Sequence, residues 1–260
     1  MRVGVIGAAG RMGATVCAAV QGADGLQLVA AVDPGGAGIP VGGPGAPLEI
    51  SADLGALVDA QVEVAVDFTV PGVAVANAVW CGEHGIHTVI GTTGVDDEAA
   101  DRLRQVYPGT GPLGCVVAPN FAIGAVLMMR FAELAAPWFE TAEIIELHHD
   151  AKVDAPSGTA VRTAQMMAAA SQEWGEDPTQ VEVVAGARGG AGPAGIRIHS
   201  VRLKGLVAHQ EVILGSGGQT LTLRHDSIDR QSFMPGVILA VRQVPARPGL
   251  TIGLEHLLNV

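Results

Sequence analysis

The feature that most constrains the fold is the alternation of short apolar runs with helix-like segments through roughly the first 120 residues. The runs are rich in Val, Ala and Ile, which is typical of parallel strands buried on both faces. Parallel strands need a helical crossover between them, so the alternation predicts a doubly wound α/β domain. The expected strands are 2–6, 26–33, 62–68, 87–91 and 115–119, with helices near 11–21, 73–84 and 96–107.

The pattern changes near residue 122, where the strand-like segments take on partial period-two alternation and are separated by glycine-rich turns. This predicts a second α+β domain with an open mixed sheet that extends to about residue 229. The expected strands are 143–149, 181–184, 196–203, 209–215 and 219–227. The expected helices are 121–136, 159–172 and 235–244, before a last strand at 250–254. The Pro/Gly-rich segment 33–47 is expected to be a surface loop without an element.

Charge and cysteine content narrow the class of protein. The 26 acidic and 15 basic residues give a net charge of −11, which repels phosphate backbones and anionic membranes, so neither nucleic acid nor a membrane is an expected partner. The three cysteines lie far apart among apolar residues and suggest neither a disulfide framework nor a zinc site. We therefore expect reduced, buried thiols, no bound metal and a cytoplasmic location.

A glycine loop follows the first strand and opens the first helix. Gly7, Gly10 and Gly13 let the backbone approach a pyrophosphate, whose charge then sits at the helix N-terminus. Asp33 ends the second strand, 33 − 13 = 20 residues beyond the last glycine, where a carboxylate binds an adenosine ribose. Together they predict a Rossmann-like dinucleotide site, against the alternatives of a tight turn and a turn-initiating aspartate. Asp33 favours NADH because it repels a 2′-phosphate, although Arg11 leaves NADPH possible.

Three further loops follow strands at the edge where a doubly wound sheet binds its ligand. Each by itself is an ordinary strand-ending turn, but three on one edge predict a rim that faces the nicotinamide ribose and the substrate. They are Asp67–Thr69, Gly91–Gly94 and Ala118–Phe121.

The most polar segment is EIIELHHDAKVDAPSGTA, residues 143–160. Along its strand, Glu146 and His148 share one face and His149 lies on the other, so only a strand that ends here can turn both imidazoles to one ligand. Lys152 adds an ammonium four residues after His148. The alternative is a core histidine beside a solvated lysine.

A helix start follows in the same segment. Ser157 is a good N-cap, and Gly158, which has no side chain, lets the free N–H groups at the start of the helix close on a carboxylate. An imidazole, a cation and an anion-binding helix terminus predict a pocket for a small carboxylate that undergoes proton transfer. The spacing of His and Asp residues here does not suit a metal.

These motifs resemble those of the 4-hydroxy-tetrahydrodipicolinate reductase (dihydrodipicolinate reductase) family of the diaminopimelate and lysine pathway, and APNFAIGAV and LVAHQEV resemble actinobacterial members. The resemblance covers essentially the whole chain, from VGVIGAAGRMG through VDFT, IGTTG and APNF to the segment 143–160. It implies reduction of a cyclic dicarboxylate by NADH or NADPH in a homotetramer built through the second domain's sheet. The implied domains are 1–121 with 230–260 for the dinucleotide, and 122–229 for substrate binding and oligomerisation.

The resemblance also implies site residues. His148 is the acid that protonates the reduced ring, and Lys152 is a second proton donor and carboxylate contact. The implied substrate-binding residues are His149, Ser157, Gly158, Thr159 and Thr93. The implied cofactor-binding residues are Gly7, Ala8, Ala9, Gly10, Arg11, Met12, Asp33, Gly91, Thr92, Thr93, Ala118, Pro119, Asn120 and Phe121, with Arg230 and Phe233 as weaker candidates.

One departure concerns Asp150-Ala151, where many members have a further histidine or bulky residue; this adds negative charge near a dianionic ligand. Two rival functions remain at this stage. A non-catalytic nucleotide sensor would have no need for a proton donor beside a carboxylate pocket. Another two-domain NAD(P)-dependent amino-acid or semialdehyde dehydrogenase would need a different motif in its substrate domain.

Overall fold

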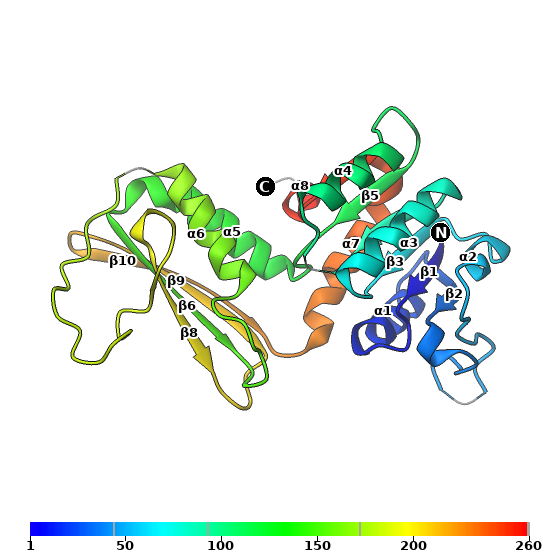
Figure 1. The fold of residues 1–260 in the computed structure, drawn as a ribbon, viewed down its shortest axis with the longest axis horizontal. Coiled ribbons are helices and arrows are strands. Elements are labelled where there is room, and N and C mark those ends of the chain that lie inside the picture. Colours follow the sequence, from blue (N-terminus) through cyan, green and yellow to red (C-terminus); the bar gives the residue numbers. More distant parts are fainter. Residues whose placement is uncertain (44, 93, 172, 259–260) are drawn as a thin grey trace. The chain divides into compact units, whose positions relative to one another are not determined.

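A computed structural model describes residues 1–43, 45–92, 94–171 and 173–258 of the chain. The chain divides into two compact units. Among the described residues, unit 1 contains those in 1–123 and 230–258, and unit 2 contains those in 124–229. Each unit has its own sheet (Figure 1).

Unit 1 is built on a six-stranded parallel sheet with the order β11-β5-β4-β3-β1-β2. The strand order reverses at β1, which pairs with β2 on one side and with β3 on the other, so the loops after β1 and β3 flank the switch point where such sheets bind ligands. The strands are β1 (Arg2–Ile6), β2 (Gln27–Val32), β3 (Val64–Asp67), β4 (His87–Ile90), β5 (Gly114–Val117) and β11 (Gly249–Ile252).

Helices cover the sheet of unit 1 in two groups. The helices α3 and α4 pack against each other over β4 and β5, while α1 and α7 pack against each other (Figure 1). All four residues of β3 are buried, as the unbroken apolar runs predict. The helices are α1 (Arg11–Gln21), α2 (Gly55–Asp59), α3 (Pro71–Glu83), α4 (Asp97–Val106), α7 (Met234–Gln243) and α8 (Glu255–Leu258).

Unit 2 has a five-stranded mixed sheet with the order β10-β9-β6-β8-β7. Among the described strands of this sheet, β6 and β8 pair in parallel, and the other three pairs are antiparallel. The strands are β6 (Thr141–His148), β7 (Gly190–Ala191), β8 (Arg197–Arg202), β9 (Ala208–Ser216) and β10 (Gln219–Ser227). The predicted combination of a doubly wound parallel sheet with a second α+β domain is therefore confirmed.

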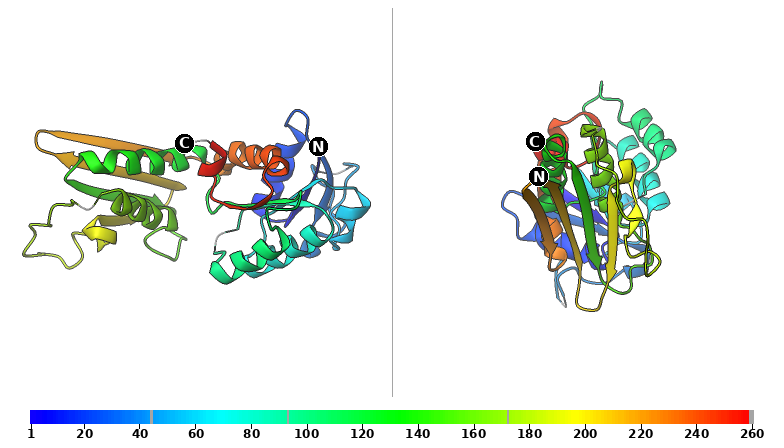
Figure 2. Two further views of the ribbon diagram at one scale, coloured as in Figure 1. Left: turned by 90° about the horizontal axis from the view of Figure 1, so that it is seen from above. Right: turned by 90° about the vertical axis from the view of Figure 1, so that its left-hand side faces the viewer.

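Two helices pack on one face of this sheet, α5 (Ile123–Ala135) and α6 (Gly158–Ala170) (Figure 2). Along β6 the residues alternate between this covered face, which includes Ile144, and the opposite face, which includes Ile145. The opposite face is only partly buried. The amphipathic alternation in the sequence thus marks a sheet covered by helices on one side.

Some short elements differ from the prediction. Residues 181–184 form no strand, and Val183 is 95% exposed. The β propensity of these residues does not produce a strand because no strand in the described part of the chain pairs with them. A 3-10 turn, Pro34–Gly36, occurs in the loop that was expected to hold no element, because the Asp33 side chain accepts a hydrogen bond from the N–H of Gly35. The elements α2, β7 and α8 were not predicted because they are too short to show a periodicity.

The three cysteines are free and buried. Burial raises the pKa of Cys17 and of Cys81 to about 12, so these thiols stay protonated and unreactive at neutral pH. Across the part of the chain that the structure describes, no helix combines the length and the apolar character needed to cross a membrane.

Candidate active site

The glycine loop after β1 forms a tight backbone turn in unit 1. Gly7 has a φ of +80°, and a Cβ added to Gly13 would lie 2.0 Å from the Gly7 carbonyl oxygen, so both positions need glycine. Gly10 is the N-cap of α1, has no side-chain cap and is followed by no acidic residue in the first turn. The loop therefore presents backbone and the positive end of a helix, which fits a pyrophosphate group.

Asp33 lies at the end of β2, next to this loop. Its Oδ2 accepts a hydrogen bond from the Ala9 N–H at 3.0 Å, and its Oδ1 accepts one from the Gly35 N–H at 2.9 Å. The carboxylate is therefore held at the loop by backbone donors on both sides. This is the position at which a ribose-binding carboxylate is expected in such sheets.

The loop after β3 is fixed by the buried carboxyl group of Asp67. Its Oδ1 accepts hydrogen bonds from the N–H and Oγ1 of Thr69, and its Oδ2 accepts one from Asn77 Nδ2. Burial raises the pKa of Asp67, although these hydrogen bonds oppose the shift. Thr92 in the next loop donates to the Thr69 carbonyl at 3.2 Å, so the two loops are joined.

Aromatic packing completes this edge of the sheet. The rings of Phe68 and Phe121 lie 5.8 Å apart at an interplanar angle of 49°. A Cβ on Gly91 would lie 2.2 Å from the Phe68 ring, so the loop after β4 requires glycine at this point. The structure thus brings the loops after β3, β4 and β5 together, as the sequence predicts for parallel strands.

The remaining predicted cofactor residues occupy the same unit. Arg11 is exposed at the start of α1, and the Ala118 N–H donates to the Ile90 carbonyl. Arg230 and Phe233 bound a 3-10 turn directly before α7. Thr93, which was predicted to contact both the cofactor and the substrate, lies outside the described residues.

In unit 2, β6 ends at His148, one residue before the predicted end at His149, so the strand stops between the two histidines. His148 Nδ1 lies 2.5 Å from Glu146 Oε2, and the side chain of His148 is 17% exposed while that of Glu146 is fully buried. Burial lowers the pKa of His148, Glu146 opposes this shift, and the positive charges of Lys152 and Arg202 lower the pKa further. The imidazole is consequently anchored through Nδ1, and its lowered pKa favours the neutral ring in the free protein.

Lys152 lies in the turn after β6. Its Nζ donates to both carboxylate oxygens of Asp154, at 2.8 and 2.7 Å, and its backbone N–H donates to the His149 carbonyl. Asp154 is largely exposed, so this ion pair is screened by water and can exchange for another carboxylate. An anionic ligand can therefore bind Lys152 by replacing Asp154.

The start of α6 has the predicted cap. Ser157 Oγ accepts a hydrogen bond from the Ala160 N–H at 3.2 Å, while the Ser157 N–H itself donates to Glu146 Oε1 at 3.2 Å. A Cβ added to Gly158 would meet no atom within 4 Å, so there is open space over the first turn. The backbone at Gly158 and Thr159 is therefore the part of this start best suited to a carboxylate.

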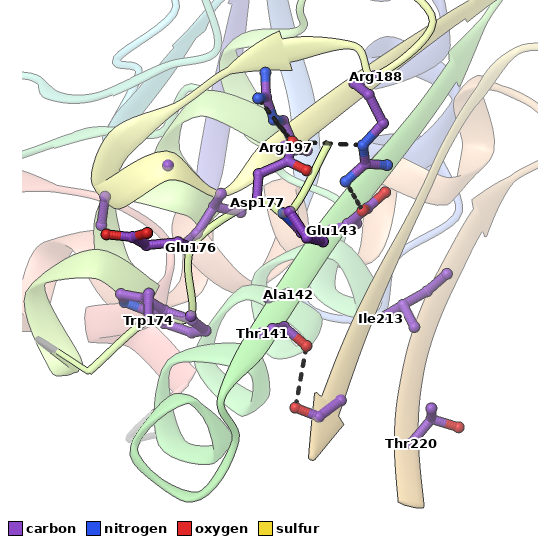
Figure 3. A pocket seen from close by; sticks show the side chains of 16 residues that line it. Thr141, Ala142, Glu143, Trp174, Glu176, Asp177, Arg188, Arg197, Ile213 and Thr220 are labelled. Atoms are coloured by element: carbon purple, nitrogen blue, oxygen red, sulfur yellow. Dashed lines mark hydrogen bonds and ion pairs between the residues drawn. The ribbon is translucent and has the colours of Figure 1, made fainter. Parts of the chain in front are cut away.

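A separate pocket of about 350 Å³ lies on the face of the unit 2 sheet that the helices leave uncovered (Figure 3). Arg188 donates to Glu143 Oε1 at 2.5 Å, and Arg197 pairs with Asp177 at 2.7 Å. Because Glu143 and Asp177 neutralise the two arginines and Glu176 adds a third carboxylate, this pocket has no excess positive charge to attract a dianion. It also contains none of the predicted site residues.

Sequence reasoning missed the groups that support the site. Arg202 is on β8, 56 residues from its partner Glu146, and Asn77 is on α3, ten residues from Asp67. Glu146 was placed on the same face as His148 but given no role. Only the strand pairing of β6 with β8 brings Arg202 to this face.

The doubly wound sheet with its glycine loop, together with a second domain that carries an imidazole and an ammonium, defines a two-domain dinucleotide-dependent oxidoreductase. The family profiles described as dihydrodipicolinate reductase, N-terminus and C-terminus, match residues 1–121 and 124–258. The chain therefore belongs to the dihydrodipicolinate reductase family of NAD(P)H-dependent reductases.

Relatives agree with this membership over the full chain. A 4-hydroxy-tetrahydrodipicolinate reductase of Nocardia farcinica is 52% identical over 264 residues, covering 100% of this chain and 99% of the relative. One of Cutibacterium acnes is 52% identical over 262 residues, with the same coverage. The predicted resemblance to actinobacterial members is thus confirmed.

Solved structures agree with the fold. The dipicolinate-bound dihydrodipicolinate reductase from Paenisporosarcina sp. TG-14 is 43% identical, with a TM-score of 0.87 and coverage of 98% of both chains. An amine dehydrogenase from Mycobacterium smegmatis has a TM-score of 0.65 at only 16% identity, covering 96% of this chain and 94% of its own. The second similarity concerns the fold alone.

Proposed function

We propose that the protein reduces the cyclic dicarboxylate 4-hydroxy-tetrahydrodipicolinate to tetrahydrodipicolinate, with His148 as the proton donor. The observation that carries this proposal is the segment from His148 to Thr159, in which an anchored imidazole, an ammonium and an open helix start follow one another. The bound dipicolinate in the Paenisporosarcina relative is a small aromatic dicarboxylate and supports this substrate class.

The chemistry assigns a role to each group. A reduced nicotinamide supplies the hydride. Loss of water from the hydroxylated ring gives a conjugated imine. Addition of hydride to this imine leaves an electron-rich enamine, which needs a positioned acid with a pKa near the working pH. The imidazolium of His148 meets that need. Lys152 is assigned two roles, as a contact to one substrate carboxylate and as a second proton donor. The backbone at Gly158 and Thr159 is assigned to the other carboxylate, with Ser157 shaping the turn and His149 as a further contact.

The cofactor is assigned to unit 1 and the substrate to unit 2. The pyrophosphate is assigned to the loop from Gly7 to Met12 and the adenosine ribose to Asp33, with Gly91, Thr92 and Ala118–Phe121 at the nicotinamide end. The carboxylate of Asp33 favours NADH because it repels a 2′-phosphate. We also assign a cytoplasmic location, on the basis of the three buried thiols.

The assembly is assigned as a homotetramer that forms through the open face of the unit 2 sheet. On this face Ile145, Leu147 and Ile213 stay partly exposed in the single chain. A sheet face with half-buried aliphatic side chains and no covering helix is suited to contact a second copy.

The proposed reaction is tested by the absorbance of reduced nicotinamide. The purified protein is mixed with the product that an upstream aldolase forms from pyruvate and aspartate semialdehyde, and NADH and NADPH are compared in parallel. Oxidation that depends on both the aldolase product and the protein is expected, with the higher kcat/KM for NADH. No oxidation with either cofactor would refute the substrate, and oxidation with aspartate semialdehyde alone would favour another dehydrogenase.

A further inference from the structure

Glu146 is the most completely engaged carboxylate near the candidate active site. Its side chain has no exposed area, and both of its oxygens accept two hydrogen bonds. Oε2 accepts from His148 Nδ1 at 2.5 Å and from Arg202 Nη1 at 2.9 Å, while Oε1 accepts from Arg202 Nη2 at 2.8 Å and from the Ser157 N–H at 3.2 Å. One side chain therefore joins the imidazole, the start of α6 and strand β8.

The surroundings of Glu146 keep its carboxyl group ionised. Burial opposes ionisation, but hydrogen bonds from Arg202, Ser200 and His148 outweigh it and hold the pKa below its usual value. The guanidinium of Arg202 donates to both carboxylate oxygens of Glu146 and also to the backbone carbonyls of Asp154 and Val201. The result is a rigid ion pair rather than a mobile surface contact.

An ionised carboxylate can only accept hydrogen bonds, which determines the state of its histidine neighbour. His148 must carry a proton on Nδ1 to donate to Glu146. In the neutral ring Nε2 is then the unprotonated nitrogen, and it is the one that gains and loses the catalytic proton.

We propose that Glu146 is a positioning residue, which fixes the ring orientation and the Nδ1–H tautomer of His148 and ties them to the carboxylate-binding start of α6, with Arg202 holding Glu146 in place. Part of this rests on the proposed function, since Nε2 has a catalytic role only if His148 is the acid. The link to Ser157 means that the proton donor and the turn that holds the substrate share one anchor.

The opposite face of the same strand offers a matched control. Glu143 pairs with Arg188 at 2.5 Å and with His199 Nε2 at 2.8 Å, so its partners are of the same two types as those of Glu146. Glu143 lies 148 − 143 = 5 residues before His148 on β6, and its side chain is on the other face of the sheet. If the cluster around Glu146 contributes only to stability, replacement of Glu146 will have the same effects as replacement of Glu143. The comparison therefore separates positioning from structural support.

The first test is nitrogen-15 NMR of the imidazole side chains in the unmodified, ligand-free protein. The signals of His148 are identified as those lost in His148→Gln. The expected result is a neutral ring protonated on Nδ1, with Nε2 as the nitrogen whose shift changes most on titration. A neutral ring protonated on Nε2 overturns the proposal, and this outcome depends neither on the Glu146 variant folding nor on the substrate being correct.

The second test compares Glu146→Gln with Glu143→Gln. Glu146 raises the pKa of His148, whereas Lys152 and Arg202 lower it. Loss of the Glu146 charge is therefore expected to shift the His148 titration to lower pH and to release the fixed tautomer. The expected loss in kcat at neutral pH is about 10–100-fold, with the dissociation constant of the dinucleotide unchanged.

In Glu143→Gln the His148 signals, and the fall of kcat/KM with rising pH that is assigned to His148, are expected to stay where they are in the unmodified protein. A Glu146→Gln protein that folds but keeps the tautomer, titration and pH profile of the unmodified protein refutes the proposal. If the NMR results hold while the enzyme turns over none of the proposed substrate, the positioning of His148 stands and the proposed function falls.

Discussion

At the scale of single residues, the protonation state of His148 is the property most open to measurement. Burial lowers its pKa below 6.5, and the opposing carboxylate of Glu146 does not reverse the shift. In the free enzyme at neutral pH the ring is therefore mostly neutral. A dianionic substrate would favour the imidazolium that the proposed protonation needs.

The pH dependence follows with a definite sign. Because the reactive form is protonated, kcat/KM is expected to fall as pH rises through the free-enzyme pKa of His148, which lies below 6.5. The corresponding fall in kcat is expected at higher pH, since bound substrate stabilises the charged ring. Initial rates measured between about pH 5 and 8 test this expectation. A kcat/KM that rises with pH across this range would contradict the role of His148 as an acid.

Replacement of the acid itself gives a second prediction. His148→Gln is expected to lower kcat by about 100-fold or more, because a general acid is lost while the neighbouring ion pair is kept. Dinucleotide binding, measured by fluorescence titration, should be unchanged. The control is His199→Gln, which removes an imidazole of similar exposure from the opposite face of the sheet. Wild-type turnover in His148→Gln would rule out this assignment.

Asp33 provides a prediction about the cofactor. Asp33→Asn is expected to weaken NADH binding by about 10-fold, because a charge-assisted hydrogen bond to the ribose is lost, and to reduce the preference over NADPH. Asp53→Asn is a close control, since Asp53 Oδ1 also accepts a hydrogen bond from the glycine N–H two residues ahead. An unchanged ratio of kcat/KM for the two cofactors in Asp33→Asn would show that Asp33 does not select between them.

At the scale of elements, the loops after β3, β4 and β5 function as one packed edge. Asp67 fixes the first loop, Thr92 links it to the second, and the Phe68 ring fills the space over Gly91. The sequence predicted that these turns share an edge, because parallel strands end together. It did not predict the contacts between them, which involve side chains separated by more than 20 residues.

Gly91→Ala tests this packed edge. The added methyl group overlaps the Phe68 ring, so a loss of about 1–3 kcal/mol in unfolding free energy is expected, together with weaker dinucleotide binding. Chemical denaturation and cofactor titration measure the two effects. In Gly111→Ala, where a Cβ would meet no atom within 4 Å, both quantities should stay close to those of the unmodified protein. Equal effects in the two variants would show that the contact with Phe68 is unimportant.

At the scale of the whole molecule, the chain forms two compact units with different sheets, and the C-terminal segment returns to complete the first. The strand β11 pairs with β5, which shows how residues after 230 join the parallel sheet. The second sheet is covered on one face only. Its open face is the surface to which we assign the tetramer.

The assembly is tested by light scattering coupled to size-exclusion chromatography. The unmodified chain is expected to elute as a tetramer, and Ile213→Glu as a smaller species, because a charge is placed on the open face of the sheet. Val58→Glu, at an exposed position on α2 of unit 1, should leave the tetramer intact. If Ile213→Glu remains tetrameric while the control also does, the interface lies elsewhere.

The sequence by itself determined the class of fold and the segments that are candidates for the chemistry. Unbroken apolar runs predicted the parallel sheet, period-two runs predicted most of the mixed sheet, and the glycine loop, Asp33 and the segment from His148 to Thr159 marked the candidate sites, because each of these signals is local. Local signals also misled at 181–184, where valines without a partner strand stay exposed.

Only the tertiary structure decided which groups support those sites. Arg202 reaches Glu146 through the pairing of β8 with β6, and Asn77 reaches Asp67 through the packing of α3 on the sheet. Such partners are chosen by strand order and burial, since a buried carboxylate must find donors wherever the fold brings them. The sequence therefore marked His148 as the candidate proton donor, whereas the fold determined which of its nitrogens is anchored.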